Sequence, residues 1–331
     1  MGGDSTDTPQ GVGHGRGRGV HVPVLLKEAI DFLHVRRGGT YIDATVGLGG
    51  HSYEIAKRLG APGHLIGLDK DPAALKIAAE RLTQGPSTPR SDSQNESERS
   101  ARDDSTGKDW PEITLLHRSF AEIATGLQPG TIDGILADVG VSSLQLEDAA
   151  RGFSFQADGP LDMRMDPQSE RTAEQVVNHL DERQLADVIY EFGEERRSRR
   201  IARAIVRSRP IRTTAQLAEV ISAAARPMNR GERIHPATRT FQALRIFVNR
   251  ELDDLKALLE AAPRILKPDG RVVVISFHSL EDRIVKDAFR EGEKKYKYYR
   301  VLTKKPVSAS EEESDRNPRA RSAKLRAAER I

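Results

Sequence analysis

The feature that most constrains the fold of this chain is a short apolar run that ends in an acid and continues into glycines, at residues 41–51 (YIDATVGLGGH). The run predicts a buried strand, a tight turn through glycines 47, 49 and 50, and a helix that begins near Ser52. Glycine allows close approach of a ligand to the backbone, and a helix start offers unpaired N–H groups. The stretch therefore fits a nucleotide-binding turn, and it also fits a connection between strand and helix that binds nothing.

Apolar strand patterns alternate with helical patterns on both sides of this turn. Strands are predicted at residues 41–43, 64–69, 113–117, 132–138 and 271–277, and helices at 25–33, 52–59 and from Pro72 onward. This alternation is typical of a doubly wound α/β fold with a parallel sheet, in which ligands bind beyond the carboxyl ends of the strands. We therefore expect Asp43, Asp69, Phe120 and Asp138 to share one edge of the sheet.

Composition along the chain predicts its domains. Helical patterns replace the strand–helix rhythm at 151–235, so we predict a core formed by 21–150 and 236–331 with an inserted helical domain at 151–235. The Gly-rich basic arm at 1–20 and the polar insertion at 84–109 are too poor in apolar residues to fold and are predicted to be disordered.

Three further segments carry predictions of their own. Residues 191–209 include seven arginines, a density that suits either RNA phosphates or a solvated helix face. A long helix that opens at 235–242 and runs to Leu259 is expected to return the chain to the core. The Arg-rich tail at 317–331 is expected to be a solvated helix or a frayed end.

The composition excludes several kinds of chemistry. The chain has no cysteine, which excludes disulfides, thiolate metal sites and a cysteine nucleophile. The formal net charge is only +3, so binding to nucleic acid depends on local basic patches. No apolar run is long enough to span a membrane, and no compact spacing of histidines and acids indicates a metal site. We expect a cytoplasmic protein that binds neither a membrane nor a metal.

The spacing around the glycines distinguishes between cofactors. Ser52 stands where a dinucleotide-binding G-x-G-x-x-G motif has its third glycine or alanine, and the chain has no G-x-x-x-x-G-K-[ST] run for a triphosphate. Asp43, four residues before Gly47, suits a cationic amino group such as that of S-adenosylmethionine. Asp69 follows the turn by roughly twenty residues, the offset at which an acid reaches ribose hydroxyls. These features favour a methyltransferase.

The lack of cysteine also narrows the choice of methylated atom. Methylation of a pyrimidine ring carbon normally uses a covalent thiolate, whereas transfer to nitrogen or oxygen needs alignment, a proton acceptor and exclusion of water. Asp138, followed by Gly140 and two serines, is the candidate catalytic residue, because its carboxylate can hold an exocyclic amine by hydrogen bonding. The alternative is that Asp138 only orients the cofactor.

Six motifs carry a resemblance to a known family: residues 43–52 (DATVGLGGHS), 138–143 (DVGVSS), 151–155 (RGFSF), 159–166 (GPLDMRMD), 235–245 (HPATRTFQALR) and 276–283 (SFHSLEDR). From about His21 to its end the chain resembles the bacterial small-subunit ribosomal RNA methyltransferase H family, also called MraW. The resemblance implies an α/β fold with a Rossmann-like class I S-adenosylmethionine-dependent methyltransferase sheet and an inserted small helical domain. It also implies methyl transfer to N4 of a cytidine in the decoding region of 16S ribosomal RNA in the small ribosomal subunit.

The resemblance also assigns site residues. The cofactor contacts that it implies are Gly49, Gly50, His51, Asp69, Phe120, Asp138 and Gln145. Asp43 and Gly47, which the spacing of the glycine turn indicates, are added to them. The candidate substrate-binding residues are Arg151, Arg164, Arg239, Arg245, Ser276 and His278, and a structural role is the alternative for the four arginines. For Arg164, an internal ion pair with Asp162 or Asp166 is the alternative. Leu144 departs from the family pattern, which usually has proline there.

Two other functions fit the same residues. One is a methyltransferase that acts on another nitrogen or oxygen, in DNA or in a small molecule. The other is a non-catalytic RNA-binding ribosome assembly factor that keeps the fold without the cofactor. The intact Asp43, Gly47, Gly49 and Asp69 speak against this second alternative.

Overall fold

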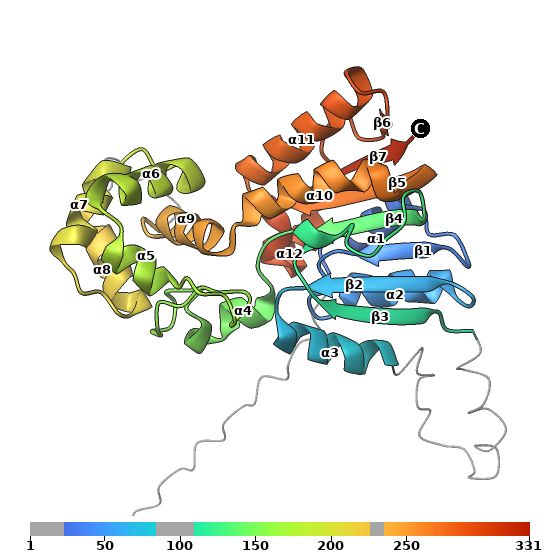
Figure 1. Cartoon of the computed structure of the whole chain (residues 1–331). Coiled ribbons are helices and arrows are strands. Elements are labelled where there is room, and N and C mark those ends of the chain that lie inside the picture. The colour runs from blue at the N-terminus through green and yellow to red at the C-terminus, as the bar shows by residue number, and fades with distance from the viewer. Residues whose placement is uncertain (1–22, 84–108, 226–234) are drawn as a thin grey trace, which may run out of the picture.

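Seven strands form one sheet at the centre of the larger part of the molecule (Figure 1). The computed structural model describes residues 23–83, 109–225 and 235–331, so the predictions for 1–20 and for nearly all of 84–109 lie outside the described residues. The strands are β1 (Thr40–Asp43), β2 (His64–Asp69), β3 (Glu112–His117), β4 (Ile132–Asp138), β5 (Leu266–Ser276), β6 (Tyr299–Val301) and β7 (Lys324–Arg330). Their order is β3-β2-β1-β4-β5-β7-β6, with β1 to β5 parallel and β7 antiparallel to both of its neighbours.

Helices cover both faces of this sheet (Figure 1). On one face lie α1 (Leu26–Leu33) and α2 (Gly50–Leu59), which pack on residues such as Tyr41, and on the other lie α10 (Glu251–Ile265) and α11 (Ser279–Lys294), which pack on residues such as Ile42. The alternation of Tyr41 and Ile42 between two cores follows from the two-residue period of a strand. The predicted doubly wound α/β architecture is confirmed.

The remaining elements surround the sheet edges. They are α3 (Pro72–Thr83), the 3-10 turn η2 (Phe120–Glu122), α4 (Ser143–Glu147), the 3-10 turn η3 (Ala149–Arg151), α12 (Glu311–Arg316) and the 3-10 turn η4 (Pro318–Ser322). Helix α2 begins at Gly50, two residues before the predicted start. Residues 268–270 form a bulge inside β5, because β4 pairs Ile132 with Leu266 and Gly134 with Arg271.

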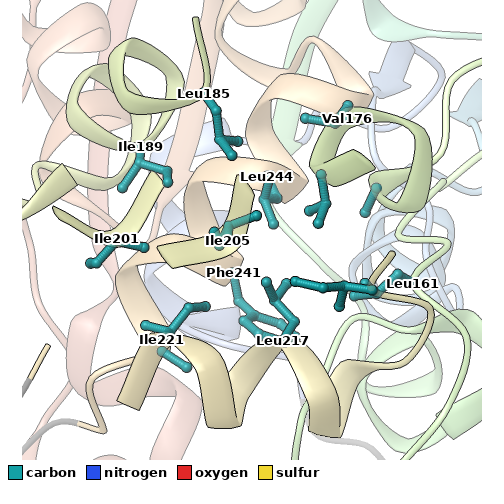
Figure 2. Packing of buried hydrophobic residues seen from close by; sticks show 14 of the residues in the cluster. Leu161, Val176, Leu185, Ile189, Ile201, Ile205, Leu217, Ile221, Phe241 and Leu244 are labelled. Atoms are coloured by element: carbon teal, nitrogen blue, oxygen red, sulfur yellow. The ribbon is translucent and has the colours of Figure 1, made fainter. Parts of the chain in front are cut away.

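The insertion forms a second hydrophobic core from α5 (Ala173–His179), α6 (Glu182–Gly193), α7 (Ser198–Arg207), α8 (Thr214–Ala224) and α9 (Thr238–Asn249). Figure 2 shows Val176, Leu185, Ile201, Leu217 and Leu244 among the side chains that meet there. The single long helix predicted to Leu259 is wrong, since Arg250 has φ of +54° and separates α9 from α10. Because Leu244 belongs to this core, the helical cluster extends beyond residue 235.

The prediction for the tail is also wrong. Residues 324–330 form β7, which lies between β5 and β6 and is buried along most of its length. Charged residues enter this position because each has a partner: Arg326 donates to Asp282 at 2.6 Å, and Glu329 accepts from Arg271 at 3.0 Å. A buried charge is tolerated when it is paired, so an Arg-rich segment becomes an internal strand here.

Candidate active site

A cavity opens at the carboxyl ends of β1, β2 and β4. Seven of the nine predicted cofactor-binding residues line it: Gly47, Gly50, His51, Asp69, Phe120, Asp138 and Gln145. The register explains why the acids of neighbouring strands reach it. Asp43 pairs with Gly67 and with Leu136, so Asp69 and Asp138 each extend two residues farther toward the edge than Asp43 does.

Asp43 lies below the cavity rather than in its wall. Its carboxylate is fully buried, accepts a hydrogen bond from Ser52 Oγ at 2.6 Å and accepts another from the Thr45 amide at 3.1 Å. Burial raises the pKa of Asp43 to about 6, and these two hydrogen bonds oppose that rise. The expectation that Asp43 faces a cationic amino group over the turn is therefore corrected: Asp43 holds the two ends of the turn together.

The glycine turn presents its backbone to the cavity. Gly47 has φ of +52°, a left-handed conformation that other residues rarely adopt, and its amide donates to Asp69 Oδ2 at 2.7 Å. A Cβ on Gly50 would lie 2.3 Å from Pro23 Cγ, so only glycine lets the first turn of α2 approach that proline. Gly49 precedes α2 and does not line the cavity.

A hydrogen-bond network supports the wall opposite the turn. Asp69 Oδ1 accepts from the Asp71 amide at 2.8 Å, and Asp71 Oδ2 accepts from Gln145 Nε2 at 2.9 Å and from Arg151 Nη1 at 2.8 Å. Gln145 also completes a capping box with Ser142 at the start of α4. The network fixes the acid of β2 and the glutamine of α4 relative to each other.

Asp138 is the acid that remains available for chemistry. Its amide donates to Thr45 Oγ1 at 2.6 Å, its Oδ2 lies 3.7 Å from His51 Nδ1, and its buried Oδ1 has no hydrogen-bond partner among the described residues. Burial raises the pKa of Asp138 to about 7, with Asp43 and Glu281 adding to the rise and Arg319 opposing it. A carboxyl group with a pKa near neutrality and a free oxygen is suited to hold or accept a proton.

The remaining wall is partly apolar. Phe120 begins η2, and the ammonium of Lys70 lies 5.9 Å from the centre of its ring. Lys70 is held in place by an ion pair with Asp254 and by donation to the Asn249 carbonyl at 2.8 Å. Apolar surface beside polar groups is the usual composition of a small-molecule site.

Arg151 does not face a substrate. Its guanidinium pairs with Asp71 at 2.8 Å and donates to the carbonyls of Arg164 and Met165, each at 2.9 Å. These partners satisfy the guanidinium from inside the protein, so the assignment of Arg151 as a substrate-binding residue is corrected to a structural one.

Arg164 and Arg245 are likewise engaged internally. Arg164 makes a bidentate pair with Asp162, with both distances 2.8 Å, which is the alternative that the sequence left open. Arg245 is mostly buried and makes a bidentate pair with Glu251 at 2.8 and 2.9 Å. The substrate-binding assignment is therefore also corrected for these two arginines.

Three candidate substrate residues remain. Ser276 is buried and donates to the Lys324 carbonyl at 3.2 Å, so it holds β7 against β5 rather than facing a ligand. His278 caps α11 through a capping box with Glu281 and also lines a second cleft. Arg239 lines the same cleft between the helical cluster and α11, and its guanidinium is exposed apart from a 3.3 Å bond to the Glu194 carbonyl. Arg239 is the candidate that remains accessible to RNA.

Sequence reasoning missed Arg319, which lines the cavity from η4. It donates to Ser143 Oγ at 2.6 Å and to the Val141 carbonyl. The NPRARSAKLR stretch that contains it suggested only a charged tail. No local pattern indicates that β7 returns this stretch to the catalytic edge, because that pairing joins residues far apart in the chain.

A seven-stranded sheet of this order, with a glycine turn after β1 and acids at the ends of β2 and β4, defines a class I S-adenosylmethionine-dependent methyltransferase. Residues 18–331 match the model of the MraW methylase family, and the chain belongs to that family.

Relatives named ribosomal RNA small subunit methyltransferase H are similar along nearly the whole chain. The relative from Koribacter versatilis is 68% identical over 94% of this chain and 94% of its own length. That from Acidobacterium capsulatum is 60% identical over 94% of this chain and 98% of its own. That from Sorangium cellulosum is 48% identical over 94% of this chain and 91% of its own.

Two features are absent from the described residues. None of the helices there is long and apolar enough to cross a membrane. Over the same ranges, no group of three or more histidines and acids is arranged to hold a metal ion.

Proposed function

We propose that this protein transfers a methyl group from S-adenosylmethionine to N4 of a cytidine in the decoding region of 16S ribosomal RNA. The observation that carries the proposal is Asp138, which lines the cavity beside the glycine turn and whose buried Oδ1 has no hydrogen-bond partner among the described residues. A cytosine amine has two N–H groups, and a carboxylate oxygen with free lone pairs is their natural acceptor.

The cavity residues fit S-adenosylmethionine. The turn at Gly47 and Gly50 offers backbone for the methionine end, Asp69 offers a carboxylate for ribose hydroxyls, and Phe120 offers an apolar wall for adenine. Asp43 would support this pocket from below by holding the turn. When bound, the cofactor supplies a methyl group on a positively charged sulfur.

In this proposal Asp138 holds and aligns the amine. Its carboxylate accepts a hydrogen bond from one N–H of the amine, which orients the nitrogen lone pair and provides an acceptor for the departing proton. The charge of Arg319 stabilises the charged carboxylate, and His51, whose Nδ1 lies 3.7 Å from Asp138, would add to this only as the imidazolium. The carboxylate must be deprotonated for this role, so a pKa of about 7 makes its state sensitive to pH near neutrality.

The helical cluster would hold the RNA. Exposed arginines lie along α7 and just before it, at positions 196, 199, 200, 203 and 207. Arg239 extends this basic surface toward the core through the cleft that it shares with Arg283. Arginines of this kind neutralise phosphates, and folded RNA offers them in many directions.

Incubation of the protein with undermethylated small ribosomal subunits and methyl-labelled S-adenosylmethionine tests the proposal. We expect label in one cytidine of 16S ribosomal RNA, at N4, after nuclease digestion and mass spectrometry. Label at another nitrogen or oxygen, or only in DNA or a small molecule, would assign a different methyltransferase. Failure to bind the cofactor in calorimetry would favour a non-catalytic assembly factor.

A further inference from the structure

Helix α11 ends beside the edge strand β6 (Figure 1), and basic and aromatic residues gather in the sequence at this junction. We call these residues the Tyr296 surface, which consists of Lys294, Lys295, Tyr296, Lys297, Tyr298, Lys304 and Lys305. Between residues 286 and 305 the chain carries eight lysines and arginines and three acids. This surface is part of neither the cofactor cavity nor the cleft beside Arg239.

The two tyrosines form an ordered aromatic platform. Their rings are stacked with a centroid distance of 5.5 Å and an interplanar angle of 5°, and Tyr296 is 51% exposed. Lys297 between them has φ of +58°, an uncommon conformation for a residue with a side chain. Such a turn carries a backbone cost, which points to a constraint beyond the connection of a helix to a strand.

Packing beneath the platform holds it in place. Tyr298 is half-buried and meets Tyr299 edge-on at 4.9 Å, and Tyr299 packs against Phe289 of α11 at 5.6 Å. A Cβ at Gly292 would lie 2.7 Å from the Tyr298 ring and 2.6 Å from the Tyr299 ring, so the glycine lets the rings lie directly on the helix. The platform is therefore rigid on its inner side, and on its outer side the Tyr296 ring is half-exposed with the Lys295 ammonium over it.

The lysines around the platform are available to an anion. Lys294, Lys297, Lys304 and Lys305 are exposed, and within the described part of the chain none of them makes an ion pair. Lys295 lies 4.7 Å from the centre of the Tyr296 ring and makes the platform itself more positive. Of the nearby acids, Glu293 accepts a hydrogen bond from the Val301 amide and Asp287 pairs with Lys286.

The tyrosines of the Tyr296 surface lie toward the end of the sheet opposite to the cavity. Lys304 and Lys305 lie nearer the cavity end, between Thr303, which bonds to Ala327, and Val307, which pairs with Leu325. Helix α11 starts just beyond the carboxyl end of β5 and ends where β6 begins. Tyr299 of β6 pairs with Arg330 of β7, and the neighbouring Glu329 pairs with Arg271, so Tyr299 lies level with the part of β5 that is far from the cavity. From Arg271 to Ser276 the strand advances roughly 17 Å. A ligand that reaches both the cavity and the tyrosines must therefore be extended and large.

We infer that the Tyr296 surface is a second RNA-binding surface, on which an unpaired base stacks on Tyr296 and the flanking phosphates pair with Lys294, Lys297, Lys304 and Lys305. Clustered cations and a half-exposed aromatic ring are the combination that binds single-stranded nucleic acid, and a base that stacks on Tyr296 takes the place of the flexible Lys295 side chain. This inference rests on the proposed function, because it assumes that the substrate is a folded RNA large enough to span the sheet.

Steady-state methylation of small ribosomal subunits by three variants tests the inference. Replacement of Lys294, Lys297, Lys304 and Lys305 by Gln should raise KM for subunits and leave kcat and cofactor affinity unchanged. It should also make the salt dependence of log KM shallower, by about 0.7 to 0.9 per lost phosphate contact. Tyr296→Ala should raise KM about tenfold, whereas Tyr296→Phe, which keeps the ring, should match the wild type.

A matched control removes the same charge elsewhere. Replacement of Lys27, Lys57, Lys76 and Lys256 by Gln, all exposed and on other helices, should leave the salt slope close to that of the wild type. Thermal unfolding of every variant checks that it folds. Equal KM and salt slope for the lysine variant and the control overturn the inference, provided that the wild type methylates subunits.

Two other outcomes separate the inference from its premises. A wild type that places no label in 16S ribosomal RNA contradicts the proposed function, and filter binding of the same variants to an unstructured RNA oligonucleotide then tests the Tyr296 surface directly. If the four lysines are needed for binding to phosphatidylglycerol vesicles and not for binding to RNA, the surface binds a membrane and the inference is overturned.

Discussion

The guanidinium of Arg319 donates a 2.6 Å hydrogen bond to Oγ of Ser143, although the two residues are 176 positions apart in the chain. The same guanidinium also donates to the carbonyl of Val141. These two bonds hold the loop that follows β4, and Asp138 is the last residue of that strand. The charge of Arg319 also opposes the rise in the pKa of Asp138. One side chain from the C-terminal region therefore holds the loop that follows the candidate catalytic acid and favours the carboxylate form of that acid.

Arg319→Gln should lower kcat/KM and move its dependence on pH. Without the positive charge the pKa of Asp138 rises further above its value of about 7, so the carboxylate form is populated only at higher pH. We expect the acidic limb of the pH profile of kcat/KM to shift to higher pH. Arg319→Lys should restore part of that shift, because it keeps the charge and loses the two-pronged contact. A profile that is lower at every pH with an unmoved limb would assign Arg319 a purely structural role.

Asp138→Asn should bind S-adenosylmethionine with near wild-type affinity and lose methyl transfer by about 100-fold or more. The amide cannot accept the proton of the amine, while its shape is unchanged. The raised pKa of Asp138 also predicts that kcat/KM of the wild type falls as pH decreases below about 7, because the carboxylate is then protonated. Calorimetry measures the affinity for S-adenosylmethionine, and single-turnover methylation measures the rate of methyl transfer. Full turnover by the variant would remove the proposed role.

Asp138→Asn should also make the protein more stable at alkaline pH. The pKa of Asp138 is raised from 3.8 to about 7 in the folded protein, so the stabilisation from this group is present at low pH and is lost as pH rises through 7. Asparagine has no charge to bury. The gain in Tm over the wild type should therefore be larger at about pH 8 than at about pH 5. Differential scanning fluorimetry at both pH values measures it, and an equal gain at both would contradict the assigned cause.

Leu325→Ala should destabilise the fold by about 2 to 5 kcal/mol, because the side chain is fully buried in β7 and its removal leaves a cavity. Ile331→Ala is the matched control, since Ile331 is 54% exposed and should change the free energy of unfolding by no more than about 0.5 kcal/mol. Urea unfolding followed by circular dichroism gives both values. Equal effects of the two substitutions would mean that the tail is not an internal strand.

Arg239→Gln should raise KM for small ribosomal subunits with little change in stability, because Arg239 is exposed in the cleft.

Arg151→Lys should instead lower the stability of the protein, with little change in KM for subunits. Lysine cannot replace the three contacts of the Arg151 guanidinium with Asp71 and two carbonyls, so Tm and cofactor affinity should fall. Steady-state kinetics and thermal unfolding of both variants form the comparison. If Arg151→Lys raised only KM for subunits, the internal role of Arg151 would be wrong.

The glycine turn and the strands that flank it could be predicted from sequence because their determinants are local. The run at residues 41–51 combines an apolar strand with glycines that have positive φ, and strands β2 and β4 have the predicted bounds. The break at Arg250 could not be predicted. Its left-handed conformation lies between two helices that are bound to different cores, and no glycine or proline marks the position.

The arginines also show which features could be predicted from sequence and which could not. Four arginines in the motifs were candidates for RNA binding or for a structural role, and the fold gives three of them internal partners at Asp71, Asp162 and Glu251. Whether an arginine binds RNA or an internal acid depends on which acid the fold brings near it. Composition alone contains no such information.

The glycine turn, the sheet and the acids at the strand ends could be predicted, since each follows from residue type and short-range spacing. Which acid faces the cavity depends on how the strands pair in three dimensions. The register that pairs Asp43 with Gly67 and Leu136 buries Asp43 and moves Asp69 and Asp138 two residues farther out. The fold also brings Arg319 to Ser143, because β7, which follows Arg319 in the chain, pairs antiparallel with β5. Both outcomes depend on hydrogen bonds between strands that are distant in sequence, and such pairings leave no local pattern.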